Sequence, residues 1–295
     1  MNLKEAKSGV FQFTVMFQSI QKCISKNKNV YTRIDVRDRE DNTAVIYDWN
    51  SIVPDMTKVP VLMDVSVEAT ERNGQVFLDL KQCAPSKDQN SMIEYFPPAK
   101  IDRKVYAREF CDYAAMLSPE AAELVKQISR NHSTEFTRLP LSEDGPFSRT
   151  SGILEATVRL VRLVQGCAGE FDYLDRNLLV CGALLYYMGY TNLMDSSFTC
   201  RNDSILTGPG LETYNMIREY GDKSGCSQYF IRDLCHIVMS RRGEGIPVIG
   251  EAILLNRLSQ TLLAMDEIHS ASLGHEKDDV FQVGRNRYFN RIQES

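Results

Sequence analysis

The spacing of apolar residues changes once along this chain, and the change limits what the chain can fold into. Up to about residue 96, apolar and polar residues alternate, which is the period of a β-strand with one buried face. From about residue 100, apolar residues recur every three or four positions, which is the period of an amphipathic helix. The change predicts two domains, at 1–96 and 97–295, within a chain of 295 residues that are 43% apolar.

The first region is predicted to form a small β-barrel. The alternation is clearest in four runs, at 11–17, 30–36, 59–67 and 76–80. Turn sequences separate the runs: KNKN at 26–29, REDN at 39–42 and RNG at 72–74. Five short strands of this kind fit a closed barrel of the oligonucleotide-binding (OB) type, and a β-sandwich is the open alternative. The polar, proline-containing stretch 86–98 is predicted to be the linker.

The second region is predicted to be all-α, without a repeat of fixed period. Ser118 and Pro119 give one helix a capping residue and a proline in its first turn. The helical period predicts helices at 104–117, 118–131, 151–166, 175–188, 210–221, 228–240 and 250–269.

Charge and cysteine content exclude several classes of protein. A formal net charge of −5 gives no overall attraction to nucleic acid or to an anionic membrane. No apolar run reaches the roughly 18 residues of a membrane span, and the first residues lack the apolar core of a signal peptide, so we expect a cytoplasmic protein without a membrane partner. The eight cysteines form no Cys-x-x-Cys pair, which predicts free, buried thiols rather than disulfides or a zinc site.

Several segments together are similar to one known family. They are KNKNVYTRIDVRDREDNTAVIYDWN, SGILEAT, LDRNLLVCGALLYYMGY, HIVMSRRGEGIPV, EAILLNRLS and VFQVGRNRYF. In this order and at similar spacing, they resemble the YhaM-type 3′-to-5′ exoribonucleases over most of the chain. That family joins an N-terminal OB domain to a C-terminal HD-type metal phosphohydrolase domain, and the resemblance implies the same two domains here.

The resemblance also implies where metal ligands would stand, and this chain departs from the family there. HD-type hydrolysis requires His and Asp side chains that hold divalent cations. The positions that match the family's ligands are Ala156, Tyr186, Tyr187, Pro209, His236, Arg241, Arg242 and Ser259. Only His236 is a histidine, and arginine would repel a cation. We therefore expect a degenerate HD domain with no catalytic residue, metal or cofactor.

Some of these residues have competing interpretations. For His236, a buried imidazole that donates to a backbone carbonyl is favoured over a ligand. Tyr186 and Tyr187 are expected to fill the vacated pocket. Arg241 and Arg242 are candidate phosphate-binding residues, although solvation at a helix end or pairing with Glu244 is the favoured interpretation.

The predicted barrel offers a second candidate site. The residues proposed to contact nucleic acid, by stacking or through phosphates, are Lys26, Lys28, Tyr31, Arg33, Tyr47, Trp49, Arg72 and Phe77. Residues 1–96 hold 12 basic and 13 acidic residues, so tight electrostatic binding is not expected. Which rings face outward depends on the register of the strands, and a slip of one residue reverses it.

Three functions of different class follow from the sequence. The first is a catalytically inactive YhaM-like protein that weakly binds single-stranded RNA or DNA through its OB domain. The second is a protein-interaction or regulatory subunit that forms homo-oligomers. The third is a working 3′-to-5′ exonuclease with displaced ligands.

Overall fold

The computed structural model describes residues 3–25, 27–54, 57, 59–72, 74–143, 145–194, 201, 204–241, 245–273 and 275–291. The chain divides into two compact units. The first comprises Met1–Pro98 with Met194–Cys200, and the second comprises Ala99–Leu193 with Arg201–Ser295. Each unit is described by itself.

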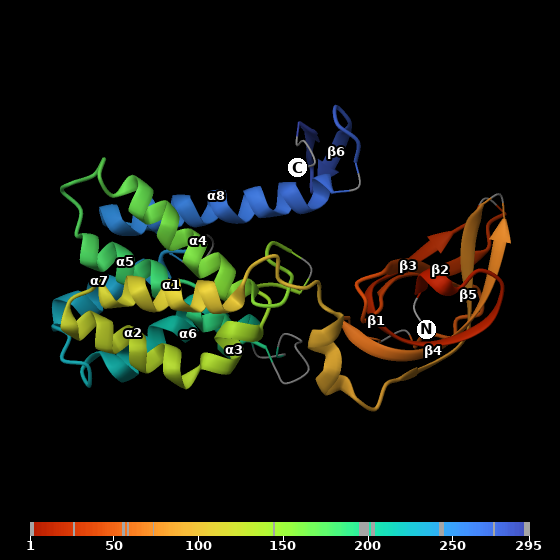
Figure 1. Ribbon diagram of the computed structural model, residues 1–295, viewed down its shortest axis with the longest axis horizontal. Coiled ribbons are helices and arrows are strands. Elements are labelled where there is room, and N and C mark those ends of the chain that lie inside the picture. Colours follow the sequence, from red (N-terminus) through yellow and green to blue (C-terminus); the bar gives the residue numbers. More distant parts are fainter. Residues whose placement is uncertain are drawn as a thin grey trace. The chain divides into compact units, whose positions relative to one another are not determined.

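The first unit is a closed five-stranded barrel (Figure 1). Its strands are β1 (Gly9–Ile24), β2 (Val30–Arg37), β3 (Thr43–Asp48), β4 (Val61–Arg72) and β5 (Gln75–Pro85). Their order around the barrel is β1-β2-β3-β5-β4, and the β3–β5 pair is parallel while the others are antiparallel. The predicted barrel is confirmed, with an OB-like topology, and the sandwich alternative is wrong.

The register of the strands decides which side chains enter the barrel core. Ile34 pairs with Ile46, and Ile46 pairs with Leu78. All three side chains are buried, together with Val15 and Phe17 of β1. Because successive side chains on a strand point to opposite faces, the odd-numbered neighbours on β2, β3 and β5 lie on the outside of the barrel.

Local hydrogen bonds explain two of the predicted turns. In the β1–β2 turn, the backbone N–H groups of Ser25 and Lys28 donate to Asn29 and Ser25, at 2.8 and 2.9 Å. In the β2–β3 turn, the Asp38 carboxylate accepts from the backbone N–H groups of Glu40 and Asn42, at 3.0 and 2.9 Å. The acceptors are backbone carbonyls in the first turn and a side-chain carboxylate in the second, and they replace the ladder bonds that the backbone loses as it reverses.

The stretch 86–98 is not the simple linker that its polar residues predict. Residues Gln89–Tyr95 form a 3-10 helix, η2, whose buried Met92 packs with Met16 and Leu62 of the barrel. The Gln89 side chain also accepts from the Leu62 N–H and donates to the Leu62 carbonyl, at 3.1 and 2.8 Å. A few apolar residues therefore suffice to fix a segment whose composition indicates a linker.

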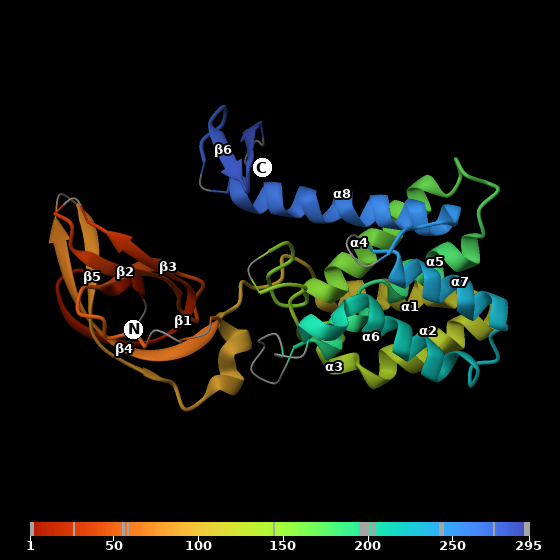
Figure 2. The same cartoon turned by 180° about the vertical axis from the view of Figure 1, so that it is seen from behind.

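The second unit is mainly helical (Figures 1 and 2). The predicted helices are confirmed, with shifted ends. Its helices are α1 (Arg103–Ala115), α2 (Pro119–Asn131), α3 (Ser133–Arg138), α4 (Gly152–Cys167), α5 (Arg176–Leu185), η3 (Met188–Asn192), α6 (Ser204–Gly221), α7 (Gln228–Met239) and α8 (Gly250–Ser272). Helix α5 is buried along most of its length and contacts α1, α2, α4, α7 and α8. Ser118 caps α2 as predicted, through its hydroxyl and the Ala121 N–H.

The prediction of an all-α second region is wrong at its C-terminal end. Two strands, β6 (Val280–Val283) and β7 (Asn286–Phe289), form an antiparallel hairpin beside the end of α8 (Figure 1). The Phe281 ring is buried between His275 and Tyr288, with ring centroids 5.5 and 5.9 Å away. Strands of four residues are too short to show an alternating period, so the sequence pattern does not reveal them.

The cysteines are free, and only some of them are buried. Cys181, Cys226 and Cys235 are buried among the described residues, whereas Cys111 is exposed. Burial raises the pKa of Cys235 to about 11. The prediction of free thiols is confirmed for the described cysteines, but burial holds for only part of them; Cys200 lies outside the described residues.

Candidate functional site

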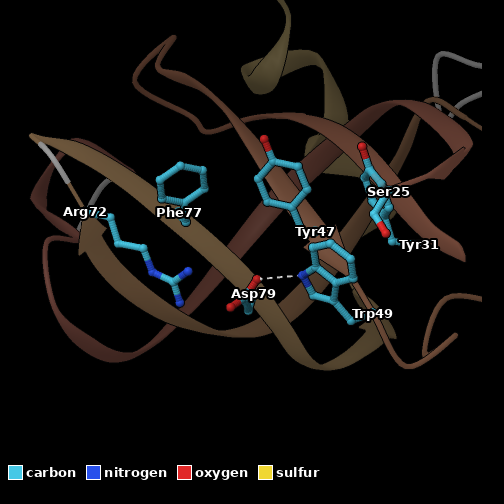
Figure 3. A pocket seen from close by; sticks show the side chains of 7 residues that line it. All are labelled: Ser25, Tyr31, Tyr47, Trp49, Arg72, Phe77 and Asp79. Carbon is cyan, nitrogen blue, oxygen red and sulfur yellow. Dashed lines mark hydrogen bonds between the residues drawn. The ribbon is translucent and has the colours of Figure 1, made fainter. Parts of the chain in front are cut away.

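Four aromatic side chains form one continuous surface on the outside of the barrel (Figure 3). The Tyr31 and Trp49 ring centroids lie 4.7 Å apart, and those of Tyr47 and Trp49 lie 6.4 Å apart. Phe77 extends the surface, with its centroid 6.2 Å from that of Tyr47. Neighbouring rings along this path are inclined by only 27–36°, so they form a shallow platform; we call these four residues the aromatic surface.

Strand alternation puts these rings together. Tyr31 is on β2, Tyr47 is on β3 and Phe77 is on β5. Neighbouring residues on a strand point to opposite faces, so the residues that point into the core fix which rings point outward. Tyr47 pairs with Arg33 on one neighbouring strand and with Asp79 on the other. Trp49 follows β3 by one residue and is 45% exposed, the most open large ring of the four. The register thus turns all four predicted rings outward.

An open cavity of about 380 Å³ lies over the aromatic surface. Besides the four rings, Ser25, Arg72 and Asp79 line it (Figure 3). The indole Nε1 of Trp49 donates to Oδ1 of Asp79 at 3.0 Å. Arg72 has no hydrogen bond or ion pair with another described residue. The cavity therefore combines stacking faces with one cation and one carboxylate.

The predicted cationic residues differ in their surroundings. Lys28 is exposed in the β1–β2 turn, where its φ is 62°. Arg33 lies beside Tyr47 in the ladder but pairs with Asp35, at 3.0 Å between Nη2 and Oδ1. Arg72 is exposed at the end of β4, and Lys26 lies outside the described residues. Two described cations, Lys28 and Arg72, are thus left without an ion pair to a described residue.

In the helical unit, four of the positions that match the family's metal ligands form one buried cluster. The Tyr187 hydroxyl and the Ser259 hydroxyl share a hydrogen bond of 2.8 Å. Arg241 donates from Nη1 to the Tyr186 carbonyl at 2.6 Å. Its guanidinium carbon lies 4.5 Å from the Tyr186 ring centroid and 5.4 Å from that of Tyr187. A tyrosine that the sequence interpretation missed, Tyr190, supplies a third ring at 5.2 Å.

This cluster is closed by side chains. Tyr186, Tyr187 and Ser259 are at most 4% exposed, and Arg241 is 6% exposed. Burial raises the pKa of the Tyr187 phenol well above its ordinary value, so the hydroxyl stays neutral at physiological pH. The interpretation of Arg241 as solvated at a helix end is wrong, because its guanidinium is enclosed by rings. Arg242 and Glu244 lie outside the described residues.

The remaining matched positions are separate from these contacts. Ala156 is fully buried in α4. Pro209 lies in α6, and its carbonyl faces Gly189 so closely that a side chain at Gly189 would collide with it. Among the described residues, the His236 ring donates to no backbone carbonyl, contrary to the interpretation favoured from the sequence. Instead, its Nε2 accepts from the Val248 N–H at 3.1 Å.

A buried ion network next to Ala156 was not predicted. Arg149 pairs with Glu155 on α4 at 2.7 Å and with Asp266 on α8 at 2.6 Å. Asp266 also accepts from the Phe147 N–H at 2.7 Å. Burial alone would lower the pKa of Arg149, but the hydrogen bonds that it donates to Glu155 and Asp266 raise it. Burial alone would raise the pKa of Asp266, whereas the bond from Arg149 holds it below its ordinary value.

Only some of the residues that the sequence analysis did not name could have been found from a sequence pattern. Asp79 stands two residues after Phe77 in an alternating run, so the two belong on one face once Phe77 is placed outside. Tyr190 lies three residues after Tyr187, a helical neighbour. Arg149 and Asp266 are 117 residues apart, and no local pattern connects them.

Two kinds of feature are absent from the described residues. Within the described residues, no group of three or more His, Cys, Asp or Glu side chains has an arrangement that could hold a metal ion. None of the described helices is both long enough and apolar enough to cross a membrane.

No protein-family model matches this chain. Among solved structures, crystal structures of the mitochondrial single-stranded DNA binding protein Rim1 from S. cerevisiae are similar to part of it. Two of them are 16% and 18% identical, cover 27% of this chain and 96% and 94% of their own chains, and have TM-scores of 0.24 and 0.25. Similarity at this level carries no information about a ligand.

Proposed function

We propose that this protein binds single-stranded nucleic acid on the aromatic surface of its barrel. The observation that carries the proposal is the continuous platform formed by Tyr31, Trp49, Tyr47 and Phe77, all on the outer face of β2, β3 and β5 or next to it. The face formed by the second and third strands is also where OB folds bind oligonucleotides. Aromatic platforms stack on bases of any sequence, and stacking contributes about 1–3 kcal/mol per base.

A single strand fits this surface better than a duplex. In a duplex the faces of the bases are stacked on each other, so exposed rings find no base to stack on. The charge near the surface is also modest, since Arg33 is paired with Asp35 and only Lys28 and Arg72 are unpaired among the described cations nearby. Stacking must therefore supply most of the binding energy, with affinity in the micromolar range.

Alanine substitutions test this proposal. Trp49→Ala and Tyr47→Ala should each weaken the binding of a fluorescent 12-nucleotide single strand by about tenfold or more, since 1–3 kcal/mol per stacked base is lost. Tyr173→Ala is the matched control, because Tyr173 is 77% exposed but belongs to the helical unit. Fluorescence anisotropy measures the dissociation constants. Equal affinity of all three variants and the parent would contradict the proposal.

The helical unit is further proposed to be a degenerate HD domain of the YhaM type that does not catalyse hydrolysis. Support comes from the chemistry of the residues at the matched positions. Alanine and proline have no ligand atom, the Ser259 and Tyr187 hydroxyls are bonded to each other, and the Arg241 guanidinium stands beside them as a positive charge. Such a cluster fills the place of an ion rather than holding one.

Metal analysis and a nuclease assay test this second part. The purified protein should hold less than one equivalent of any transition metal and should leave labelled RNA and DNA strands intact in Mn²⁺ or Mg²⁺. A stoichiometric metal with 3′-to-5′ trimming would instead support an exonuclease with displaced ligands.

A scaffold without nucleic-acid binding is the alternative function. Large apolar side chains on the helical unit favour it, because Ile246 and Val248 are 82% and 73% exposed. A scaffold of this kind would form homo-oligomers or bind a partner protein. Light scattering of the full chain, beside the anisotropy measurement, separates the two functions. A stable oligomer with no affinity for single strands would favour the scaffold.

Phosphate binding by Arg241 and Arg242 stays a prediction. Because Arg241 is enclosed by three rings, a phosphate would have to displace at least one of them. Protection of the fold by millimolar phosphate in thermal melts, lost in Arg241→Met, would support it.

A further inference from the structure

A carboxylate lies within a surface that is proposed to bind a polyanion. Asp79 lines the same cavity as the four rings, and its Oδ1 accepts from the Trp49 indole at 3.0 Å. Asp79 forms no ion pair with a described residue, and the neighbouring Lys81 pairs with Glu68 at 2.6 Å. Lys81 also interacts electrostatically with Asp79, but its ion pair is with Glu68. A carboxylate without an ion pair of its own repels phosphate, so the presence of Asp79 here requires another explanation.

We infer that Asp79 recognises the base stacked on this surface and favours guanine. The inference rests on the proposed function and specifies its ligand further. A carboxylate accepts hydrogen bonds but donates none when ionised, so it selects bases by their donors. Single-stranded bases expose their Watson–Crick edges to such contacts.

The hydrogen-bonding capacity of Asp79 fits guanine best. An ionised carboxylate has about four lone-pair positions, and the Trp49 N–H occupies one of them. Guanine presents two adjacent donors, N1–H and the N2 amino group, which match the two carboxylate oxygens. Adenine and cytosine each place a ring-nitrogen acceptor beside their amino donor, and in thymine or uracil two carbonyl oxygens flank the single N–H. In these bases an acceptor would face a carboxylate oxygen.

The fold holds Asp79 in position for this contact. It pairs with Tyr47 in the β3–β5 ladder and stands two residues after Phe77, on the same face of β5. A base stacked on Tyr47 or Phe77 therefore has its edge near Asp79 (Figure 3). The bond from Trp49 fixes the orientation of the carboxylate before the base arrives, which lowers the entropy lost on binding. Arg72 also lines the cavity and supplies a cation for the phosphate.

Aromatic rings with a carboxylate also bind quaternary ammonium groups, but the geometry here favours a flat ligand. Ammonium cages surround the cation with rings that face a common centre. Here three of the four neighbouring ring pairs are inclined by 27–36°, and only Tyr31 and Tyr47 are inclined more steeply, by 52°. Most of the rings therefore lie side by side across the sheet. Arg72 also adds a positive charge to the cavity lining, which would repel a cation.

A host–guest series on the full chain tests the inference. The host is a fluorescent 12-nucleotide oligo(dT), and its two central positions carry guanine, hypoxanthine, adenine, cytosine or thymine. Guanine should bind about tenfold more tightly than thymine, in line with the discrimination of a bidentate contact. Hypoxanthine, which lacks the N2 amino group, should lie between the two. Asp79→Asn should reduce the guanine-to-thymine ratio to about one, because the amide presents a donor to the edge of guanine.

Matched variants keep the result interpretable. Asp64→Asn removes a different barrel carboxylate, on β4, that does not line this cavity, and it should leave the base preference unchanged. If Trp49→Ala weakens every strand while Asp79→Asn leaves the base ratios as they were, the inference fails and the proposed function stands. If no strand binds to the parent, both fail. Displacement of a bound strand by millimolar tetramethylammonium, but not by guanosine monophosphate, would overturn the choice of a base as ligand.

Discussion

Arg241 is a buried cation enclosed by tyrosine rings. Its guanidinium is 6% exposed, donates to the Tyr186 carbonyl and lies within 4.5–5.4 Å of three tyrosine ring centroids. Among the described residues it forms no ion pair, so the ring faces and one carbonyl must offset its lost hydration. The family resemblance singles out Arg241, but no local sequence pattern indicates that its guanidinium points into a group of rings.

Removing this guanidinium should destabilise the fold. Arg241→Met keeps the length and apolar stem of the side chain but leaves the Tyr186 carbonyl without its donor. Hydrogen bonds that involve a charged group contribute about 1.5–3 kcal/mol, and we expect a loss of this size in the free energy of unfolding. Urea titration followed by circular dichroism measures it. The control is Arg257→Met, at an exposed position of α8. An equal loss of unfolding free energy in both variants would show that the contacts of Arg241 with the rings add no stability.

The adjacent tyrosines allow a second test at the residue scale. Tyr186→His with Tyr187→Asp restores the residue pair that the family carries. It should not produce nuclease activity, because Ala156, Pro209 and Arg241 would still provide no ligand. Replacing two buried rings by smaller polar groups should lower the free energy of unfolding by about 3–5 kcal/mol. Thermal melting and a nuclease assay in Mn²⁺ measure both effects. Strand cleavage by this variant would show that a usable metal shell survives.

At the scale of elements, ion pairs connect the loop before α4 with α8. Arg149 bridges Glu155 and Asp266, whose side chains are 0% and 5% exposed, and the Phe147 N–H completes the bonding of Asp266. The Arg149 guanidinium also lies 4.6 Å from the centroid of the Phe147 ring. The two ends of this network are far apart in sequence, so it is a product of tertiary packing.

Neutralising Asp266 should cost stability in a pH-dependent way. Asp266→Asn leaves Arg149 partly uncompensated, and breaking a buried pair costs about 3–5 kcal/mol. The folded-state pKa of Asp266 lies below its ordinary value, so its stabilisation is present above the unfolded-state pKa and is lost as pH falls through the folded-state pKa. The difference in unfolding free energy between parent and variant should thus be largest at pH 7 and should become smaller below about pH 4. Urea titrations across this range, with exposed Glu267→Gln as control, measure it; a constant difference would be the contrary result.

The elements show which parts of the fold a sequence reveals. Long runs of one period identified strands β1, β2, β4 and β5 and helices α1, α2 and α4 to α8, because burial of one face imposes the period directly. The six-residue α3, the η2 segment and the β6–β7 hairpin were missed, since each is too short to show a period. The sequence indicated the four rings of the aromatic surface as candidates, but their outward orientation depended on a register that only strand pairing fixes.

At the scale of the molecule, each unit has its own interior. The barrel core includes Val15, Ile34, Ile46 and Leu78, and the Met92 segment closes a second cluster on it. The helical unit is built around the buried α4 and α5. The net charge of −5 is spread over the whole chain, so the attraction of nucleic acid must come from a local surface rather than from the molecule's overall field.

The barrel should therefore fold and bind without the helical unit. We expect residues 1–98, which include η2 and its cluster, to bind the guanine-containing strand with a micromolar dissociation constant close to that of the full chain. Ending the fragment at residue 86 instead would remove Met92 and Gln89, and should lower its melting temperature. Circular dichroism and fluorescence anisotropy measure the two properties.

The salt dependence of that binding gives the sharpest test of how the surface works. Lys28 and Arg72 are the described cations near the rings without an ion pair to a described residue, and Arg33 adds a third if it leaves Asp35. Two or three phosphate contacts predict that the logarithm of the binding constant falls with the logarithm of salt concentration at a slope of about −1.4 to −2.1, since each contact on a single strand contributes about −0.7. Arg72→Gln should make this slope shallower by about 0.7 and leave the preference for guanine unchanged. Titrations between low and physiological salt measure both. A salt-dependence slope of twice this size for residues 1–98 would mean that electrostatic contacts outside the aromatic surface dominate binding. If only the full chain has such a steep slope, the extra contacts belong to the helical unit.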